Sequence, residues 1–66
     1  MSWHNNLQAA RTRKNMTVQE IADKLECHPR TVKRHEEGFC EPCLRDLIVY
    51  AETYGVTLDY LLRGKQ

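Results

Sequence analysis

Two adjacent segments decide the fold of this 66-residue chain: Thr17-Val18-Gln19-Glu20-Ile21-Ala22-Asp23-Lys24-Leu25 and Pro29-Arg30-Thr31-Val32-Lys33-Arg34-His35-Glu36-Glu37-Gly38. The first begins with a capping-box pattern, in which the Thr17 hydroxyl caps a backbone N–H and the Glu20 carboxylate reaches back to the N-cap. Its apolar residues recur with the spacing of one helix face, at Val18, Ile21, Ala22 and Leu25. The segment is therefore predicted to be a short amphipathic helix.

The second segment carries the start and stop signals of another helix. Pro29 is favoured at the first helical position because an N–H would have no helical partner there, and Gly38 is a typical C-terminal stop. Only Glu26-Cys27-His28 separates the two predicted helices. Two short helices joined in this way form a helix-turn-helix unit, whose second helix can lie in the major groove of DNA.

One face of this second helix is basic, because Arg30, Lys33 and Arg34 lie at i, i+3 and i+4. Val32 and His35 lie on another face and are expected to point into the core. An arginine can donate two hydrogen bonds to guanine O6 and N7, and a lysine can reach the same edge or a phosphate. The spacing therefore favours DNA binding. The alternative interpretation is a basic face that only contacts solvent, which is common on any helix.

The remainder of the chain also has a helical pattern, with no alternating pattern of a strand. A first helix is expected from Asn5 to Lys14, with Leu7, Ala10, Arg11 and Lys14 on one stripe and a break at Asn15-Met16. A fourth is marked by Leu44, Leu47, Ile48, Ala51 and Tyr54 and stopped by Gly55, and a short fifth by Leu58, Leu61 and Leu62, ending near Gly64. Tyr50, Tyr54 and Tyr60 are expected to be core or interface aromatics. We predict an all-α fold of five short helices in a single domain, residues 1–66.

Length and composition favour a binding surface over an enclosed site. A chain of 66 residues holds one small domain and leaves little room for a substrate pocket. No Ser–His–Asp, paired-carboxylate or phosphate-loop signature occurs, so an enzyme is not expected. No apolar run approaches the ~20 residues that span a membrane, and the first residues lack the pattern of a signal peptide. We expect a cytoplasmic protein, at the nucleoid, without a membrane partner.

The net charge of +1 hides an uneven distribution. Up to His35 the chain carries seven Lys and Arg against three Asp and Glu, and from Glu36 onward it carries three against six. A basic end opposite an acidic end suits a one-sided surface for an anionic partner.

Three cysteines, Cys27, Cys40 and Cys43, raise the question of a metal site. An odd number without a secretion signal argues against a disulfide framework. Cys40 and Cys43 have CxxC spacing, and Cys27-His28 would complete a tetrahedral zinc set. A single CxxC is a weak signal, however, and Cys27-His28 lies in the turn of the helix-turn-helix. We interpret the three as free cysteines and expect no metal and no cofactor, with zinc binding or a redox role as the alternative.

The sequence resembles the phage Cro and repressor type of helix-turn-helix, also called the XRE family. The resemblance rests on 17–25 and 31–38 and extends through Pro42 and Leu44 to Gly55-Val56-Thr57-Leu58-Asp59-Tyr60-Leu61-Leu62. It covers about residues 5–64 and implies a five-helix, lambda-repressor-like DNA-binding domain, with the helix-turn-helix at helices 2 and 3.

The resemblance also implies roles for individual residues. Base reading falls on Pro29, Arg30, Lys33 and Arg34. Contacts to the DNA backbone fall on Arg11, Arg13, Thr17, Val18, His28, Phe39 and Cys40. The family's ion pair between helices 1 and 3 falls on Arg11 and Glu36. A homodimer, formed on DNA or before binding, would use Val56, Thr57, Leu58 and Tyr60.

Four positions depart from the family's pattern. Val18 stands where a phosphate-binding Gln is common, although the helix N-terminus there can still hold a phosphate. Glu26 stands where the turn usually has Gly, so a left-handed conformation at this residue would be strained. His35 replaces an apolar residue and, if buried and neutral, needs a hydrogen-bond partner. Pro29 can make only apolar contacts with a base.

The expected function is sequence-specific transcriptional regulation, most like that of a Cro repressor. A dimer would bind a palindromic operator in double-stranded DNA, with half-sites about 34 Å apart, and block RNA polymerase. An activator role would instead use the acidic residues Glu20, Asp23 and Glu26 on the first quoted helix. A truncated repressor domain, a restriction-modification controller, and an antitoxin or other protein-interaction module on the same fold remain the alternatives.

Overall fold

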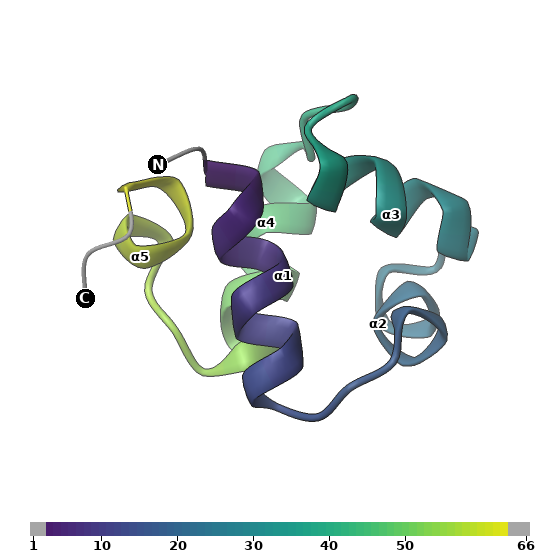
Figure 1. Ribbon diagram of the computed structural model, residues 1–66, viewed down its shortest axis with the longest axis horizontal. Coiled ribbons are helices and arrows are strands. Elements are labelled where there is room, and N and C mark those ends of the chain that lie inside the picture. Colours follow the sequence, from purple (N-terminus) through teal and green to yellow (C-terminus); the bar gives the residue numbers. More distant parts are fainter. Residues whose placement is uncertain (1–2, 64–66) are drawn as a thin grey trace.

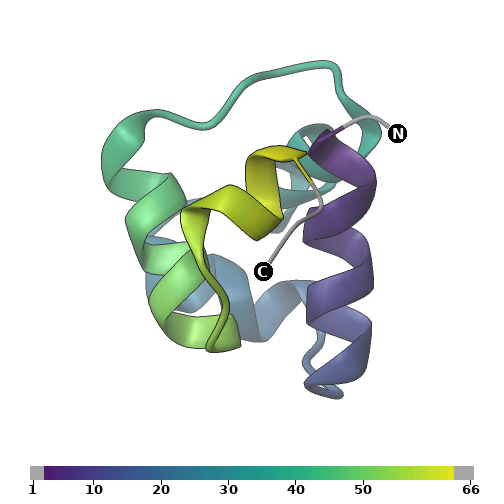
Figure 2. The same ribbon diagram turned by 90° about the vertical axis from the view of Figure 1, so that its left-hand side faces the viewer.

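The computed structural model describes residues 3–63, and five helices make up the regular structure of this part of the chain. They are α1 (Trp3–Arg13), α2 (Val18–Leu25), α3 (Pro29–Glu37), α4 (Leu44–Tyr54) and α5 (Leu58–Arg63). The predicted all-α architecture of five short helices is therefore confirmed. In Figure 1, α1 runs through the middle of the molecule, with α2 and α3 on one side and α5 on the other. Figure 2 shows the 38–43 connection arching over one edge between α3 and α4.

The capping signals of α2 and α3 act as predicted. The Glu20 N–H donates to the Thr17 Oγ1 at 3.1 Å, and the Thr17 N–H donates to the Glu20 Oε1 at 2.8 Å, which completes the capping box. Pro29 opens α3, and Gly38 ends it in the left-handed conformation with φ 83°. Local sequence therefore sets the bounds of both helices, and the turn between them follows from those bounds.

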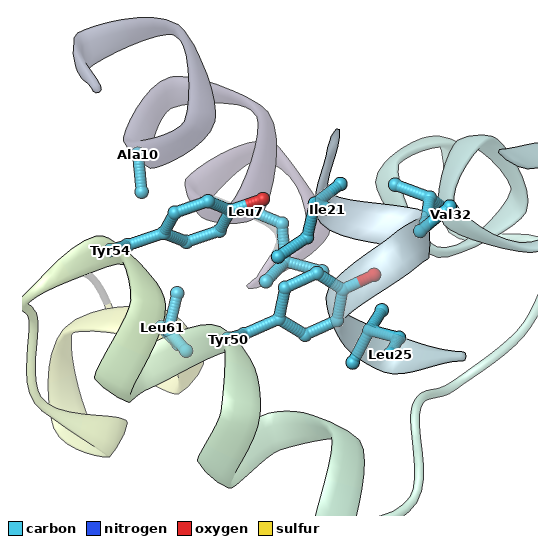
Figure 3. Close-up of a cluster of buried hydrophobic side chains, with 9 residues drawn as sticks. Leu7, Ala10, Ile21, Leu25, Val32, Tyr50, Tyr54 and Leu61 are labelled. Carbon is cyan, nitrogen blue, oxygen red and sulfur yellow. The ribbon is translucent and has the colours of Figure 1, made fainter. Parts of the chain in front are cut away.

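The core lies where α1, α2 and α4 meet, with α3 and α5 closing its two sides. Its buried hydrophobic residues are Leu7, Ala10, Ile21, Ala22, Leu25, Val32, Tyr50, Tyr54 and Leu61. Figure 3 shows the two tyrosine rings of α4 inside this cluster, stacked with their centroids 5.7 Å apart. These two rings supply much of the apolar area because each aromatic side chain buries about 150–250 Å².

The observed helices differ from the predicted ones in two respects. Helix α1 begins at Trp3 and ends at Arg13, whereas the sequence suggested Asn5 to Lys14. Leu44 and Ile48, two of the residues taken to mark α4, are 66% and 41% exposed. The buried face of α4 is centred on Tyr50 and Tyr54 instead, because their larger rings fill the space that α1, α2 and α3 enclose. The stop expected near Gly64 lies outside the described residues.

A buried amide joins the two ends of the described chain. The Asn6 side chain, which is 4% exposed, donates through Nδ2 to the carbonyls of Tyr60 at 3.1 Å and Leu61 at 3.2 Å. Asn6 lies in α1, and both acceptors lie in α5. The last of these helices, α5, is thereby held against α1.

Among residues 3–63, no helix is long and apolar enough to cross a membrane.

The turn between α2 and α3 holds a strained residue, because Glu26 has φ 58°. We expect Glu26→Gly to raise the free energy of unfolding by about 1 kcal/mol, since glycine reaches this conformation without the Cβ clash. Asn15, with φ 57°, offers a matched control: asparagine tolerates the left-handed region, so Asn15→Gly should gain less. Urea unfolding of both variants measures the difference, and a midpoint for Glu26→Gly at or below that of the parent chain contradicts the expectation.

Candidate nucleic-acid interface

Three neighbouring residues on one side of α3 fix this helix to the rest of the molecule. Val32 is fully buried, His35 is 3% exposed and Glu36 is 7% exposed. They lie at i, i+3 and i+4 and so form a single face, which is the face that the sequence assigned to Val32 and His35. The opposite face of α3 is consequently left to solvent.

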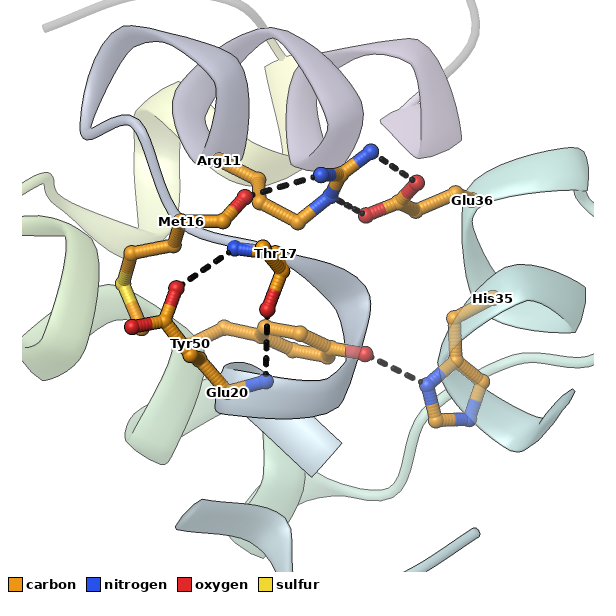
Figure 4. A network of polar contacts seen from close by, with 7 residues as sticks. All are labelled: Arg11, Met16, Thr17, Glu20, His35, Glu36 and Tyr50. Atoms are coloured by element: carbon orange, nitrogen blue, oxygen red, sulfur yellow. Dashed lines mark hydrogen bonds and ion pairs between the residues drawn. The ribbon is translucent and has the colours of Figure 1, made fainter. Parts of the chain in front are cut away.

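Glu36 receives a two-pronged contact from α1, so the ion pair expected from the family resemblance is present. The Arg11 Nε lies 2.7 Å from the Glu36 Oε2, and the Arg11 Nη2 donates to Oε1 at 3.2 Å. The Arg11 Nη1 also donates to the Met16 carbonyl at 2.9 Å, just before α2 begins. Figure 4 shows this guanidinium between the linker that leads into α2 and the last turn of α3. The hydrogen bond with Glu36 raises the pKa of Arg11, and one side chain ties three segments together.

His35 has the partner that its burial requires. Its Nδ1 lies 2.8 Å from the Tyr50 hydroxyl, and the two rings meet edge to face with centroids 5.8 Å apart (Figure 4). Burial lowers the pKa of His35, although Asp46 and Glu36 act in the opposite direction. Burial also raises the pKa of Tyr50. A neutral imidazole and a neutral phenol therefore form a hydrogen bond between the inner sides of α3 and α4.

The solvent face of α3 forms one wall of a shallow groove. Its lining residues are Arg30, Lys33, Arg34, Glu37, Phe39 and Cys40. The three basic residues predicted to read bases thus lie together, with Phe39, 78% exposed, at the start of the following loop. Such a face offers hydrogen-bond donors for guanine O6 and N7 and an exposed ring for sugar or methyl contacts.

The N-terminus of α3 is capped by the side chain of His28, so the orientation of this imidazole is fixed. The Arg30 N–H donates to the His28 Nδ1 at 3.1 Å. The Nδ1 atom must then be unprotonated, which leaves the His28 Nε2 as the atom able to face a partner. At the other end, a Cβ on Gly38 would lie 2.8 Å from the His4 Nδ1, so a larger residue there would require the His4 side chain to move.

A second groove runs beside the first and is lined by Gln8, Arg11, Val18, Lys33, Glu36 and Glu37. It includes two of the residues expected at the DNA backbone, Arg11 and Val18. Thr17 is adjacent in sequence and caps α2, whose first N–H groups form an N-terminus suited to a phosphate. The structure thus places Arg11 and Val18 beside Lys33 of the basic face of α3.

Arg13 lies elsewhere. Its guanidinium stands over the ring of Tyr60, 5.2 Å from the centroid, and its Nη2 donates to the Tyr60 hydroxyl. A residue expected at the DNA backbone is therefore in contact with one expected at the dimer interface, rather than with the α3 group. In the same segment Val56 is half-buried, while Thr57 and Leu58 are exposed.

The three cysteines do not combine with other side chains into a metal-binding group. Cys40 and Cys43 are exposed, Cys27 is half-buried, and all three are free thiols. Burial raises the pKa of Cys27. Within residues 3–63, no group of three or more His, Cys, Asp or Glu side chains is placed to hold a metal ion. Cys40 also lines the groove of α3.

Two residues that shape this surface were not assigned to it from the sequence. Tyr50 was expected only as a core or interface aromatic, with no sign that it would face His35 across two helices. Glu37 could have been found, because it lies at i+7 from Arg30 and so continues the stripe of Arg30, Lys33 and Arg34.

A family model described as helix-turn-helix matches residues 7–61. An uncharacterised HTH-type transcriptional regulator, YqaE, of Bacillus subtilis (strain 168) is 38% identical over 60 residues, which are 91% of this chain and 52% of that protein. The HTH-type transcriptional activator BcrR of Enterococcus faecalis is 30% identical over 66 residues, covering 100% of this chain and 32% of that protein. The chain thus spans about half or less of the length of these relatives.

Two solved structures have the same fold. The P22 c2 repressor protein, in complex with a synthetic operator, superposes with a TM-score of 0.91 at 17% identity, over 98% of both chains. A transcriptional regulator from Listeria innocua superposes with a TM-score of 0.87 at 25% identity, over 98% of this chain and 61% of that one. The five helices therefore have the lambda-repressor-like arrangement that the sequence predicted.

Proposed function

Because this chain belongs to the XRE-type helix-turn-helix family, we propose that it is a sequence-specific DNA-binding transcriptional regulator whose α3 enters the major groove. The observation that carries the proposal is the groove of α3, where Arg30, Lys33 and Arg34 lie side by side and exposed. The opposite face of α3 is held by Arg11 and Tyr50, so the helix that carries these donors is fixed in position before DNA binds. Such prior order reduces the entropy lost on binding.

The proposed contacts with bases and with phosphates are made by residues in or beside the two grooves. Arg30, Lys33 and Arg34 read base edges, with Pro29 in apolar contact, while Arg11, the α2 N-terminus and His28 hold phosphates. Phe39 and Cys40 border the backbone at the far end of the first groove. These contacts need no cofactor and no chemical step, so the proposed role is binding and not catalysis.

A single copy offers too little surface for tight and specific binding, so the proposed regulator acts as a dimer on a palindromic operator. The proposed contacts between the two copies are made by Val56, Thr57, Leu58 and Tyr60. The dimer is proposed to form on DNA, in the manner of a Cro protein. Occupation of such an operator would exclude RNA polymerase. Selection of bound sites from random duplex DNA tests the whole proposal: we expect an enriched palindrome with half-sites about 34 Å apart.

Salt dependence separates this function from that of a protein-interaction or antitoxin module. A protein that neutralises several phosphates loses orders of magnitude in DNA affinity between about 50 and 200 mM salt. A module that binds only another protein shows neither this slope nor an enriched site. The absence of both would leave the interaction module as the better account of the surface.

Arg34→Ala tests the assignment of α3 as the reading helix. Loss of a base-contacting arginine should weaken operator binding about tenfold and relax the preference at one base pair of each half-site. Arg13→Ala is the matched control, because Arg13 contacts Tyr60 and lies apart from the α3 groove. It removes the same charge and should leave every base preference in place. Binding curves on the selected site and on its single-base variants give the comparison, and identical behaviour of the two variants would show that the roles are wrongly assigned.

A further inference from the structure

Glu37 is a carboxylate on a surface proposed to face a polyanion. It is exposed, and it continues the stripe of Arg30, Lys33 and Arg34 by one more turn of α3. It lines the groove of these basic residues and also the second groove, which contains Arg11 and Val18. The side chain of Glu37 therefore stands where the proposed base contacts and the proposed phosphate contacts meet.

The fold does not account for a carboxylate at this position. None of the side chains described in residues 3–63 makes a hydrogen bond or ion pair with Glu37, although Lys33 lies one turn earlier on the same face. Glu37 also occupies the last turn of α3, where the helix dipole disfavours negative charge. Its neighbour Glu36 has the same disadvantage, but Glu36 is paired with Arg11.

In contact with DNA, this carboxylate would be repelled by phosphates unless a base offered it a hydrogen-bond donor. In the major groove the donors are the N4 amino group of cytosine and the N6 amino group of adenine. Adenine presents the acceptor N7 beside its amino group, whereas cytosine presents N4 alone. A carboxylate that arrives at an adenine edge therefore meets repulsion from N7, and cytosine is the base that fits.

We propose that Glu37 determines specificity at this surface by accepting a hydrogen bond from the N4 amino group of a cytosine beside the base pair that Arg34 reads. DNA with any other base at that position leaves the carboxylate unpaired beside phosphates and is rejected. This is discrimination by an unfavourable contact with wrong partners as well as a favourable contact with the right one. The inference rests on the proposed DNA-binding function, and it adds one base and one residue to it.

Glu37→Gln removes the charge, keeps the shape and adds a donor. Glutamine pairs with adenine N6 and N7, so the preference at that position should change from cytosine to adenine. Affinity for random duplex DNA should also rise about fivefold, since one repulsive charge close to phosphates is lost. Glu52→Gln is the matched control: it changes the net charge equally, and Glu52 is exposed on α4, outside both grooves.

The experiment is site selection from random duplexes with the parent chain and both variants, followed by titrations on random DNA at two salt concentrations. A change from cytosine to adenine in Glu37→Gln, with Glu52→Gln unchanged, supports the inference. A gain in affinity with every base preference retained overturns it, because Glu37 then only repels phosphates and reads no base. Equal gains in both variants also overturn it, because net charge then explains them.

The failure of this inference can be told apart from failure of the proposed function. If the parent chain enriches a site whose base preferences Glu37→Gln leaves intact, the role of Glu37 is wrong and the DNA-binding function stands. If the parent chain enriches no site at all, both are overturned. Urea unfolding of each variant confirms that the exposed substitutions leave the fold intact.

Discussion

Arg11→Met should lower the free energy of unfolding by about 3 kcal/mol, because it leaves the carboxylate of Glu36 buried without its partner. Glu36 is only 7% exposed and accepts two hydrogen bonds from this one guanidinium. The substitution also removes the donor to the Met16 carbonyl, so the linker before α2 loses its tie to α1. Urea unfolding monitored by circular dichroism measures the loss.

Two further variants show whether burial is the cause. Arg63 and Asp59 form an exposed pair, also at 2.7 Å, so Arg63→Met breaks a contact of the same length in solvent and should leave the unfolding curve nearly unchanged. Adding Glu36→Leu to Arg11→Met should recover much of the stability, since no unpaired charge then remains in the interior. A loss from Arg63→Met as large as that from Arg11→Met would contradict the explanation.

Tyr50→Phe should destabilise the protein by about 2 kcal/mol, because the buried Nδ1 of His35 would lose its partner. The next tyrosine along the same face of α4 provides a close control. The Tyr54 hydroxyl is buried and has no hydrogen-bond partner among the described residues, so Tyr54→Phe should be neutral or slightly stabilising. Thermal or urea unfolding of the two variants distinguishes a lost hydrogen bond from a lost hydroxyl, and equal losses would refute the role given to His35.

His35 also makes the stability dependent on pH. Because burial lowers the pKa of His35 in the folded protein below the unfolded value of about 6.5, the unfolded chain binds the proton more readily. Stability from the neutral imidazole is complete above pH 6.5 and falls as the pH drops toward the folded pKa. Unfolding curves at successive pH values should show this decline, and His35→Phe should reduce it. A decline of equal size in His35→Phe would assign it to other groups.

The parts of the fold that depend on neighbouring residues could be predicted from the sequence. The capping box at Thr17 and the glycine stop at Gly38 each follow from a few adjacent residues, whereas the left-handed conformation at Glu26 was expected from the family resemblance. The basic stripe of α3 was predictable because helical spacing alone places Arg30, Lys33 and Arg34 on one face.

Contacts between distant helices were harder to predict. The orientation of α4 depends on which side chains fill the space against α1, α2 and α3, and spacing alone suggested Leu44 and Ile48 as well as Tyr54. The hydrogen-bond partner of His35 could be identified only from the inward orientation of Tyr50, which the sequence does not specify. The Arg11–Glu36 pair was expected from the family resemblance, since spacing within one helix says nothing about a contact between α1 and α3.

The bond between Asn6 and α5 has a consequence for the order in which the protein acquires its structure. Its partners are 54 and 55 residues away from Asn6 in the sequence, so all of the chain from α1 to α5 must be available before this bond can form. Helices α2 and α3 meet through short-range contacts and can form early, whereas the packing of α1 against α5 closes a loop of more than fifty residues. On the ribosome, this closure comes only when α5 has emerged. A chain that stops short of Tyr60 would leave the Asn6 amide in the interior with neither carbonyl.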